Sequence, residues 1–424
     1  MSKQVNNATW QFTPTTPLQI NSVSISDDGT RCAFGSSFER GSGTFYTYLF
    51  DDQGNQLWKQ PISSGETYQG VFWVAVSGDG QFVASGGETS DSKDKNNPEP
   101  GYLQAFAADS AQVLLNINLY SRINQVSLSH DGQYLAVCYG HTIEIYQLNE
   151  AATAYASIFK DTSTSYSINS CVISHDGSTV VASGIQYADD NNSTPSNDAT
   201  TSSTTSTSGQ IVSYSINNGT VSPMGQCTLD STGCMRVAVT DNGQIWAASL
   251  HDGSCVLVHS LKPNELAWQC KPDQSDLSLA YAVDVTQTDM GDVYVACGAN
   301  LDSKTNGGFL YLVKSVRMVY ADDGYPEPYF KGIIQWSTPI QFGVNPGVSL
   351  DKNATYVTAT DGKPDGQTVK ESAGSFYLFE AATGTLIWQQ NTNMMNWPMM
   401  LAQDGGSVIG GSDNGSVYYW SLNN

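Results

Sequence analysis

Apolar and polar residues alternate in short runs along the whole chain, and these runs recur in a fixed order. Each copy has an alternating run ending at or near a Ser or Thr, then usually an Asp-Gly or Asn-Gly turn, then a second apolar run. Alternation with a period of two predicts β-strands, and these turn residues accept the positive φ of a tight hairpin. The pattern therefore predicts repeated hairpins. The eight copies occupy residues 21–37, 72–87, 124–140, 169–184, 235–250, 281–298, 346–360 and 397–412.

The residue just before each turn measures the spacing of the copies. The interval ranges from 45 residues, between Ser129 and Ser174, to 66 residues, between Ser174 and Thr240. Such spacing fits one four-stranded blade with its loops. A third run, usually opened by glycine, and a fourth run with a bulky anchor supply the other two strands. The tryptophan anchors are Trp58, Trp268, Trp336 and Trp388.

The two ends of the chain complete each other. The eighth copy stops after its third run, close to Asn424, and the run around Trp10 matches the fourth-run pattern. We therefore expect an all-β fold, a single closed eight-bladed β-propeller of four-stranded antiparallel blades whose N-terminal strand completes the last blade. One domain would span residues 1–424, and residues 1–17 would close the last blade. The blades would begin near residues 18, 69, 122, 167, 233, 280, 344 and 395.

Two segments and the turns resemble known propeller repeats. FYLFEAATGTLIWQQNT (376–392) resembles the repeat of pyrroloquinoline-quinone-type propellers, and YLFDDQGNQLWKQPI (48–62) is a weaker copy. The S-x-D-G turns are similar to those of WD40 repeats, without their Gly-His and Trp-Asp pairs. The resemblance implies an eight-bladed, quinoprotein-like fold. Quinone dehydrogenases of that family hold their cofactor against a vicinal disulfide and Ca²⁺, and this sequence has no adjacent cysteines. No cofactor or family catalytic residue is carried over.

Charge and cysteine content narrow the classes of partner. The chain has 18 basic and 40 acidic residues, a net charge of −22, which disfavours nucleic acid and anionic lipid. The same charge favours cationic partners or divalent metal, or serves solubility alone. No secretory signal and no long apolar segment are evident, so no membrane insertion is expected. Eight dispersed cysteines fit reduced structural thiols in a cytoplasmic protein.

Catalytic and metal-binding motifs are not evident. His130 and His175 occupy equivalent S-H-D-G turns, where a polar residue is expected as part of the turn. The histidines have no nucleophile signature beside them, and the glycine-rich stretches lie in hairpin turns. We therefore expect no catalytic residue, no metal site and no cofactor.

The lengths of the loops indicate that one face of the propeller carries most of the long connections. Five connections between the second and third strands are long, and in a propeller these all emerge on the same face. Two acidic, Asn-rich stretches, 91–101 and 188–209, are expected to be solvated loops rather than calcium loops. Residues 315–332 are expected as a surface loop on the opposite face. The five long connections are Phe38–Gly43, Glu88–Pro100, Tyr187–Ser208, Asn300–Gly307 and Asp361–Gly374.

The innermost strands begin at the mouth of the central channel, on the face with the long loops. Aromatic rings and amides at these positions suggest a ligand cup, and packing between blades is the alternative. The candidate ligand-binding residues are Asn21, Phe72, Trp73, Asn124, Asn169, Tyr281 and Trp397. Met235 and Pro346 hold the equivalent positions in the other two copies.

The sequence favours a non-catalytic scaffold that binds a protein or another ligand through a loop-rich acidic face. A quinone-dependent or other propeller enzyme is one alternative, and a glycan-binding lectin is another. A protein partner is therefore expected, with a glycan as the alternative partner and no nucleic acid. The sequence does not indicate the oligomeric state.

Overall fold

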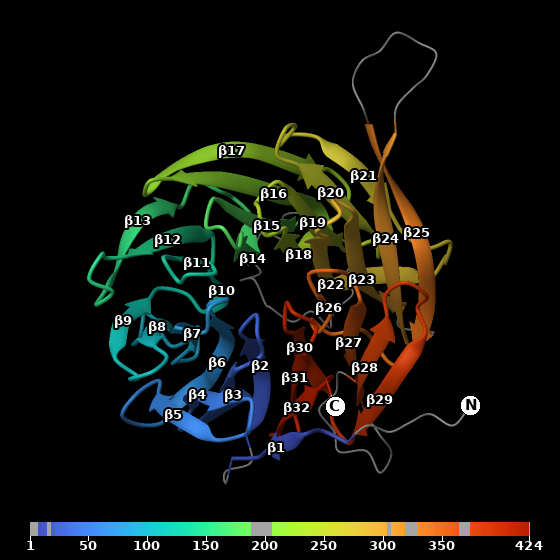
Figure 1. Ribbon diagram of the computed structural model, residues 1–424. Coiled ribbons are helices and arrows are strands. Elements are labelled where there is room, and N and C mark those ends of the chain that lie inside the picture. The colour runs from blue at the N-terminus through green and yellow to red at the C-terminus, as the bar shows by residue number, and fades with distance from the viewer. Residues whose placement is uncertain are drawn as a thin grey trace.

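The chain forms strands and turns around a central axis (Figure 1). The computed structural model describes residues 7–14, 18–187, 206–302, 307–318, 329–363 and 374–423. No helix occurs among these residues, so none has the length and apolarity needed to cross a membrane. The all-β class expected from the alternating pattern is confirmed.

The described strands pair into seven antiparallel sheets, six of which have four strands. In five of the six, four consecutive strands run in chain order. These are β10 (Ile123–Leu128), β11 (Tyr134–Tyr139), β12 (Thr142–Leu148) and β13 (Tyr155–Asp161); β14 (Ser167–Ile173), β15 (Thr179–Tyr187), β16 (Ser206–Asn217) and β17 (Thr220–Leu229); β18 (Cys234–Val239), β19 (Ile245–Leu250), β20 (Cys255–His259) and β21 (Leu266–Cys270); β22 (Leu277–Gln287), β23 (Val293–Leu301), β24 (Gly308–Met318) and β25 (Tyr329–Ile340); and β26 (Ser349–Leu350), β27 (Tyr356–Gly362), β28 (Gly374–Glu380) and β29 (Leu386–Thr392).

The sixth four-stranded sheet joins the two ends of the chain. Its order is β1-β32-β31-β30, and Trp10 lies opposite Tyr419. The Trp10 ring stacks on Tyr419 at 5.1 Å between centroids, and its Nε1 donates to the Asp52 carbonyl at 3.0 Å. The expected pairing of the N-terminal strand with the last strand is therefore present. These strands are β1 (Trp10–Phe12), β30 (Asn396–Leu401), β31 (Ser407–Ser412) and β32 (Val417–Ser421).

The seventh sheet has eight strands, which differs from the eight separate four-stranded sheets that we expected. Residues Phe38–Gly43, expected as a loop, continue β3 instead and pair with β6: Phe38 lies opposite Gln69 and Gly43 opposite Thr67. This pairing joins two four-stranded sets into one sheet. The strands are β2 (Gln19–Ile25), β3 (Arg31–Gly43), β4 (Tyr46–Asp51), β5 (Gln56–Pro61), β6 (Thr67–Val76), β7 (Phe82–Glu88), β8 (Gly101–Ala107) and β9 (Val113–Leu119).

One other loop expectation changes in detail. Residues 315–318 and 329–332, expected in a surface loop, are paired ends of β24 and β25, with Met318 opposite Tyr329. Residues 89–100 form turns and bends, as expected for a long connection. Most of 188–209, and parts of the connections after β23, β24 and β27, lie outside the described residues. The seventh copy starts its inner strand only at Ser349, because Pro346 lacks an N–H for the ladder.

The repeated S-x-D-G turns are held by one hydrogen-bond pattern. The first hydroxyl donates to the Asp or Asn side chain two residues later, as from Ser26 to Asp28 at 2.7 Å and from Ser77 to Asp79 at 2.6 Å. The same hydroxyl accepts the backbone N–H five residues on, at 3.0 Å from Arg31. The fourth residue is a glycine with positive φ, 71° at Gly29. The motif is therefore a structural requirement of the turn.

The seventh turn breaks this rule and predicts a stabilising substitution. Ala354 takes the place of the glycine and has a φ of 51°, a region that a Cβ disfavours. We expect Ala354→Gly to raise the free energy of unfolding by roughly 0.5–1 kcal/mol, since the relief of strain exceeds the entropy cost of glycine. Denaturant unfolding measures the change. A lower midpoint in the variant would contradict the strain.

Side chains of the innermost strands also tie neighbouring strand sets together. The Ser24 hydroxyl accepts the Val76 N–H at 2.9 Å, and the Ser127 hydroxyl accepts the Ile173 N–H at 3.2 Å. Asp284 does the same for the Leu350 N–H at 2.7 Å, and desolvation raises the pKa of its carboxyl to about 7. These hydrogen bonds satisfy backbone N–H groups on the innermost strands that have no partner strand on the side of the axis.

All eight cysteines are free, and all except the half-buried Cys270 are buried. Burial raises the pKa of the Cys234 thiol to about 12, so this side chain packs as a small apolar group.

Candidate functional site

Seven of the eight positions that open the inner strands lie at β-bulges or similar register shifts. The register shifts across Asn21, Phe72, Asn124, Asn169, Met235, Tyr281 and Trp397. A bulge takes a residue out of the ladder and re-aims its side chain. The seven predicted site residues are each partly exposed. The positions chosen from the sequence thus coincide with a bulge that recurs at the start of the inner strands, at one end of the axis.

Arg236 on β18 lies at the centre of this feature. Its Nη1 donates to the Asn169 carbonyl on β14 at 3.2 Å and approaches Gln125 Oε1 on β10 at 3.5 Å. Its guanidinium carbon lies 4.8 Å from the ring centroid of Trp73 on β6 and 5.7 Å from that of Tyr281 on β22. Residues from five strand sets meet at this one side chain, so it lies across the axis.

Arg122, just before β10, is the second cation of the site. Its guanidinium carbon lies 4.1 Å above the Phe72 ring. Desolvation lowers the pKa of Arg122, the Glu88 carboxylate opposes that shift, and the charge of Arg236 adds to it. Glu88 is buried and accepts a hydrogen bond from Gln69 Nε2 at 2.5 Å. Arg122 therefore has an acidic neighbour, whereas the partners of Arg236 within the described part of the chain are neutral.

Both arginines keep unused hydrogen-bonding capacity. Among the residues that the structure describes, the buried Nε atoms of Arg122 and Arg236 have no hydrogen-bond partner. A buried donor without a partner is costly, and it is satisfied when an acceptor binds. An anionic acceptor such as a carboxylate fits the fork of donors on each guanidinium group.

The other predicted residues take different roles. Asn124 Nδ2 donates to the Ile168 carbonyl at 2.7 Å and so links β10 to β14. Trp397 Nε1 donates to Asp413 Oδ1 at 2.6 Å, and burial raises the pKa of Asp413 to about 7. The Oδ1 atom of Asn21 is buried and has no described partner. Phe72, Trp73, Asn169 and Tyr281 are the predicted residues that contact the arginines through their rings or through a backbone carbonyl.

The sequence interpretation missed both arginines. Arg236 follows Met235 at the position where other copies have Ser22, Trp73, Gln125 and Ser170. An arginine at an axial position, in a chain with only 18 basic residues, was the signal that could have found it.

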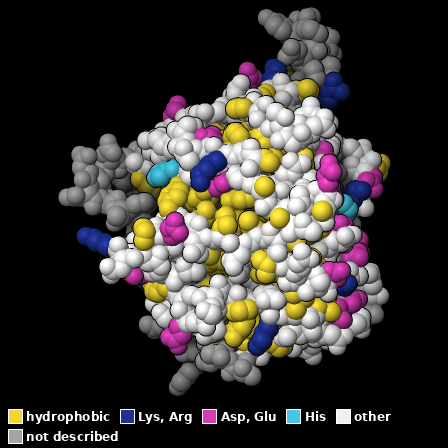
Figure 2. Space-filling model, turned by 90° about the vertical axis from the view of Figure 1, so that its left-hand side faces the viewer, with side chains coloured by type: hydrophobic (Ala, Val, Ile, Leu, Met, Phe, Trp, Pro, Cys, Tyr) yellow, Lys and Arg dark blue, Asp and Glu magenta, His cyan; other side chains and the backbone are white. Residues whose placement is uncertain are grey.

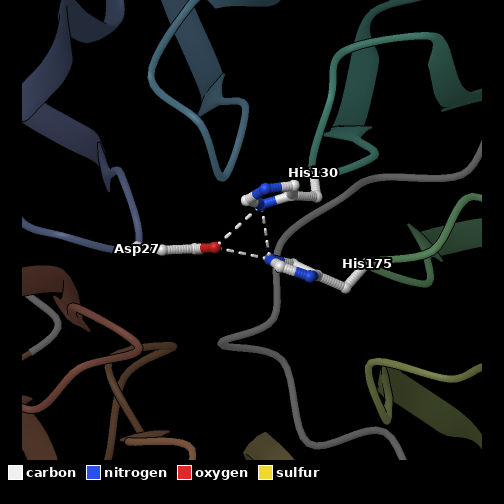
Figure 3. Close-up of side chains that lie close together, drawn as sticks. All are labelled: Asp27, His130 and His175. Carbon is white, nitrogen blue, oxygen red and sulfur yellow. Dashed lines mark hydrogen bonds and ion pairs between the residues drawn. The ribbon is translucent and has the colours of Figure 1, made fainter.

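At the other end of the axis, the first turns of three strand sets converge. His130 and His175 lie in the turns after β10 and β14, as expected, and both meet Asp27 from the turn after β2 (Figure 3). Asp27 Oδ2 lies 2.9 Å from His130 Nδ1 and 2.6 Å from His175 Nε2. The Asp27 carboxylate raises the pKa of His175, although desolvation of the ring, the largest single influence, lowers it. The sequence interpretation did not find this cluster, because its three residues lie far apart in the chain.

The remaining histidines are isolated from one another. His141 Nδ1 lies 2.8 Å from the Tyr166 carbonyl oxygen, His251 Nε2 lies 2.7 Å from the Met235 sulfur, and His259 stacks on Phe330. Among the described residues, only Asp27, His130 and His175 group as potential metal ligands.

The two best-formed surface depressions of the described residues are not at the candidate site. Their volumes are about 430 and 520 Å³. The first is lined by residues between Ala354 and Ile387, and the second by residues between Leu18 and Glu66. The candidate site is defined by side chains that converge on the axis.

Comparison with known proteins supports the fold. No protein-family model matches the chain, and no curated protein matches it. The β-propeller domain of Myceliophteria thermophila Cps50 (Swd1) aligns with a TM-score of 0.52 at 10% identity, covering 98% of this chain and 99% of that chain. Chaetomium thermophilum Sqt1 aligns with a TM-score of 0.65 at 11% identity, covering 99% of this chain and 98% of that chain.

Sqt1 bound to the N-terminus of ribosomal protein L10 aligns with a TM-score of 0.66 at 11% identity, covering 98% of this chain and all of that chain. At these identities the similarity concerns the fold alone. Together with the seven antiparallel sheets around one axis, it establishes that this chain has the β-propeller fold.

Proposed function

We propose that the chain is a non-catalytic scaffold that binds a protein partner through a carboxylate-bearing segment placed over Arg122 and Arg236. The observation that carries the proposal is Arg236, whose guanidinium group reaches the axis with only neutral partners among the residues that the structure describes. A partly desolvated cation of this kind is stabilised by an anionic acceptor. A carboxylate side chain or the C-terminus of a polypeptide supplies one.

We further propose that the propeller has eight blades and forms one domain over residues 1–424. In this proposal the eight-stranded sheet counts as two blades, β2–β5 and β6–β9, joined by the β3–β6 pairing. The sheet that contains β1 and β32 is then the blade that closes the ring. The contacts of β2 with both β30 and β31 support this arrangement.

A protein partner suits the site better than a glycan. Sugars bind to free aromatic faces, and here a guanidinium group covers one face of Phe72 and lies near Trp73. Sqt1, which shares the fold, is recorded with the N-terminus of a ribosomal protein. That complex supports the use of a propeller for a terminal protein segment.

The acidic face expected from the sequence does not carry this proposal. Figure 2, turned by 90° from Figure 1, presents the side of the molecule, where several acidic side chains lie close together along one edge and others lie singly. Charges further away than about 10 Å are screened at physiological salt. The two arginines therefore place positive charge at this end of the axis, with Glu88 beside Arg122, even though the net charge is −22.

Selection from a random peptide library tests the proposal. We expect peptides selected on the wild-type protein to be enriched in Asp, Glu or a free C-terminal carboxylate. Arg236→Gln should weaken their binding about tenfold or more, because glutamine keeps a donor for the Asn169 carbonyl but removes the charge. Fluorescence polarisation with a selected peptide measures the loss.

Arg31→Gln serves as the matched control, since Arg31 follows a turn at the opposite end of the axis. Its affinity for the peptide should equal that of the wild type. Neutral or basic peptides whose affinity survives Arg236→Gln would refute the proposal. Binding of a neutral glycan that survives the same substitution would favour the lectin alternative.

A further inference from the structure

The cluster of Asp27, His130 and His175 lies at the end of the axis opposite the arginines, and the proposed function does not use it. The three side chains come from three turns that are far apart in sequence and point at one another (Figure 3). Each is the second residue of its S-x-D-G turn, where the turn itself does not need the side chain. The turn is held by its first and third residues, as in Ser129 to Asp131 at 2.8 Å.

Backbone bonds between neighbouring turns fix the positions of the cluster. The Asp27 N–H donates to the Gly78 carbonyl at 3.0 Å, and the His130 N–H donates to the His175 carbonyl at 2.9 Å. The Asp79 N–H donates to the His130 carbonyl at 2.9 Å. The three side chains therefore start from a rigid frame, which lowers the cost of holding them together.

The turn between them has a glycine at the same position, and its lack of a side chain makes room for the cluster. A Cβ at Gly78 would lie 2.2 Å from His130 Nδ1, 2.6 Å from Asp27 Oδ2 and 2.7 Å from His175 Nε2. The space beside Gly78 is thus occupied by the three potential ligand atoms. Gly78 has no positive φ, so its backbone does not require glycine.

The triangle of ligand atoms has sides of 2.6, 2.9 and 3.1 Å, the last between the two imidazole nitrogens. Bonds of about 2.1 Å at right angles place neighbouring ligands of an octahedral site about 3.0 Å apart, and a tetrahedral site places them about 3.4 Å apart. The triangle therefore fits one face of an octahedron. Direct hydrogen bonds from the imidazoles to Asp27 would have similar lengths. A metal titration distinguishes a metal site from a metal-free, hydrogen-bonded cluster.

We propose that Asp27, His130 and His175 bind one divalent first-row transition-metal ion, with the remaining coordination positions open to solvent. Two imidazoles and one carboxylate suit such ions, whereas Ca²⁺ prefers an all-oxygen shell. The side chains are 27–46% exposed, which leaves access for the ion and for water ligands. The net charge of −22 raises the local concentration of cations. This replaces the expectation from sequence that no metal site exists.

Isothermal titration of the tag-free protein with Ni²⁺ tests the site. We expect one saturable equivalent with a dissociation constant on the order of micromolar, and a higher melting temperature that a chelator reverses. Binding should weaken at acidic pH, because protonated imidazoles cannot ligate. Ca²⁺ at the same concentration should give no shift.

Three variants distinguish Ni²⁺ binding at this cluster from Ni²⁺ binding at carboxylates elsewhere on the protein. His175→Ala should abolish the one-to-one binding, and Gly78→Ala should do so while all three ligands remain. His141→Ala, at an exposed histidine outside the cluster, should bind as the wild type does. Melting temperatures without metal establish that each variant is folded. No saturable Ni²⁺ binding in the wild type, or binding by His175→Ala and Gly78→Ala that equals wild-type binding, would show a hydrogen-bonded cluster that holds no metal.

Discussion

Deletion of residues 1–14 is expected to lower the free energy of unfolding by about 5 kcal/mol and to promote aggregation. Trp10 loses its stacking on Tyr419, and Phe12 loses its packing on Phe50, where the ring centroids are 4.8 Å apart. Burial of a large aromatic side chain contributes about 2–3 kcal/mol. The deletion also exposes the edge of β32, whose backbone groups then seek another strand.

Thermal unfolding with light scattering measures both effects. Gln11→Ala is the matched control in the same strand, because Gln11 is exposed and its side chain donates a hydrogen bond to Ser416 Oγ at 3.1 Å. It should leave the melting temperature within about one degree of the wild type. A truncated protein that melts like the wild type and stays monodisperse would show that β1 does not stabilise the fold.

Gly87→Ala is expected to destabilise the protein by about 3 kcal/mol. A Cβ at Gly87 on β7 would lie 2.0 Å from the Gly70 carbonyl oxygen and 2.9 Å from the Phe72 nitrogen on β6. Both are backbone atoms, so relief requires the two strands to move apart. The strain falls on the bulge that carries Phe72, and we therefore expect weaker binding of acidic peptides as well.

Gly65→Ala provides the comparison for that variant. Nothing lies within 4 Å of a Cβ at Gly65, and its φ is not positive. Denaturant midpoints should therefore fall for Gly87→Ala and stay unchanged or rise slightly for Gly65→Ala. Equal midpoints for the two variants would mean that β6 and β7 adjust without cost.

Most of the fold could be predicted from the repeat pattern, because the interactions that produce the pattern are local in sequence. Period-two alternation and the S-x-D-G turn act over a few residues, so each hairpin could be found from the sequence. The β1–β32 pairing could also be predicted, since the last copy lacked one strand and the run around Trp10 matched it. Propensity alone could not show that residues Phe38–Gly43 pair with β6, because both loop and strand fit that glycine-rich segment.

The candidate site was only partly predictable for a different reason. The positions of Phe72, Trp73 and Tyr281 follow from the repeat, so their location near the axis could be inferred. What they contact could not, because Arg236 and Arg122 reach them from other strand sets. The cluster of Asp27, His130 and His175 has the same origin, since its members are 45 to 148 positions apart in the chain.

Charge reversal tests the central claim, that the arginine pair binds an acidic protein segment, most directly. A peptide selected on the wild-type protein is compared with its Lys-substituted form, on the wild type and on the Arg122→Glu/Arg236→Glu variant. We predict that the acidic peptide binds only the wild type and that the Lys-substituted peptide binds only the variant, with both interactions weakened by salt. Retained binding of the acidic peptide by the folded variant would contradict the account.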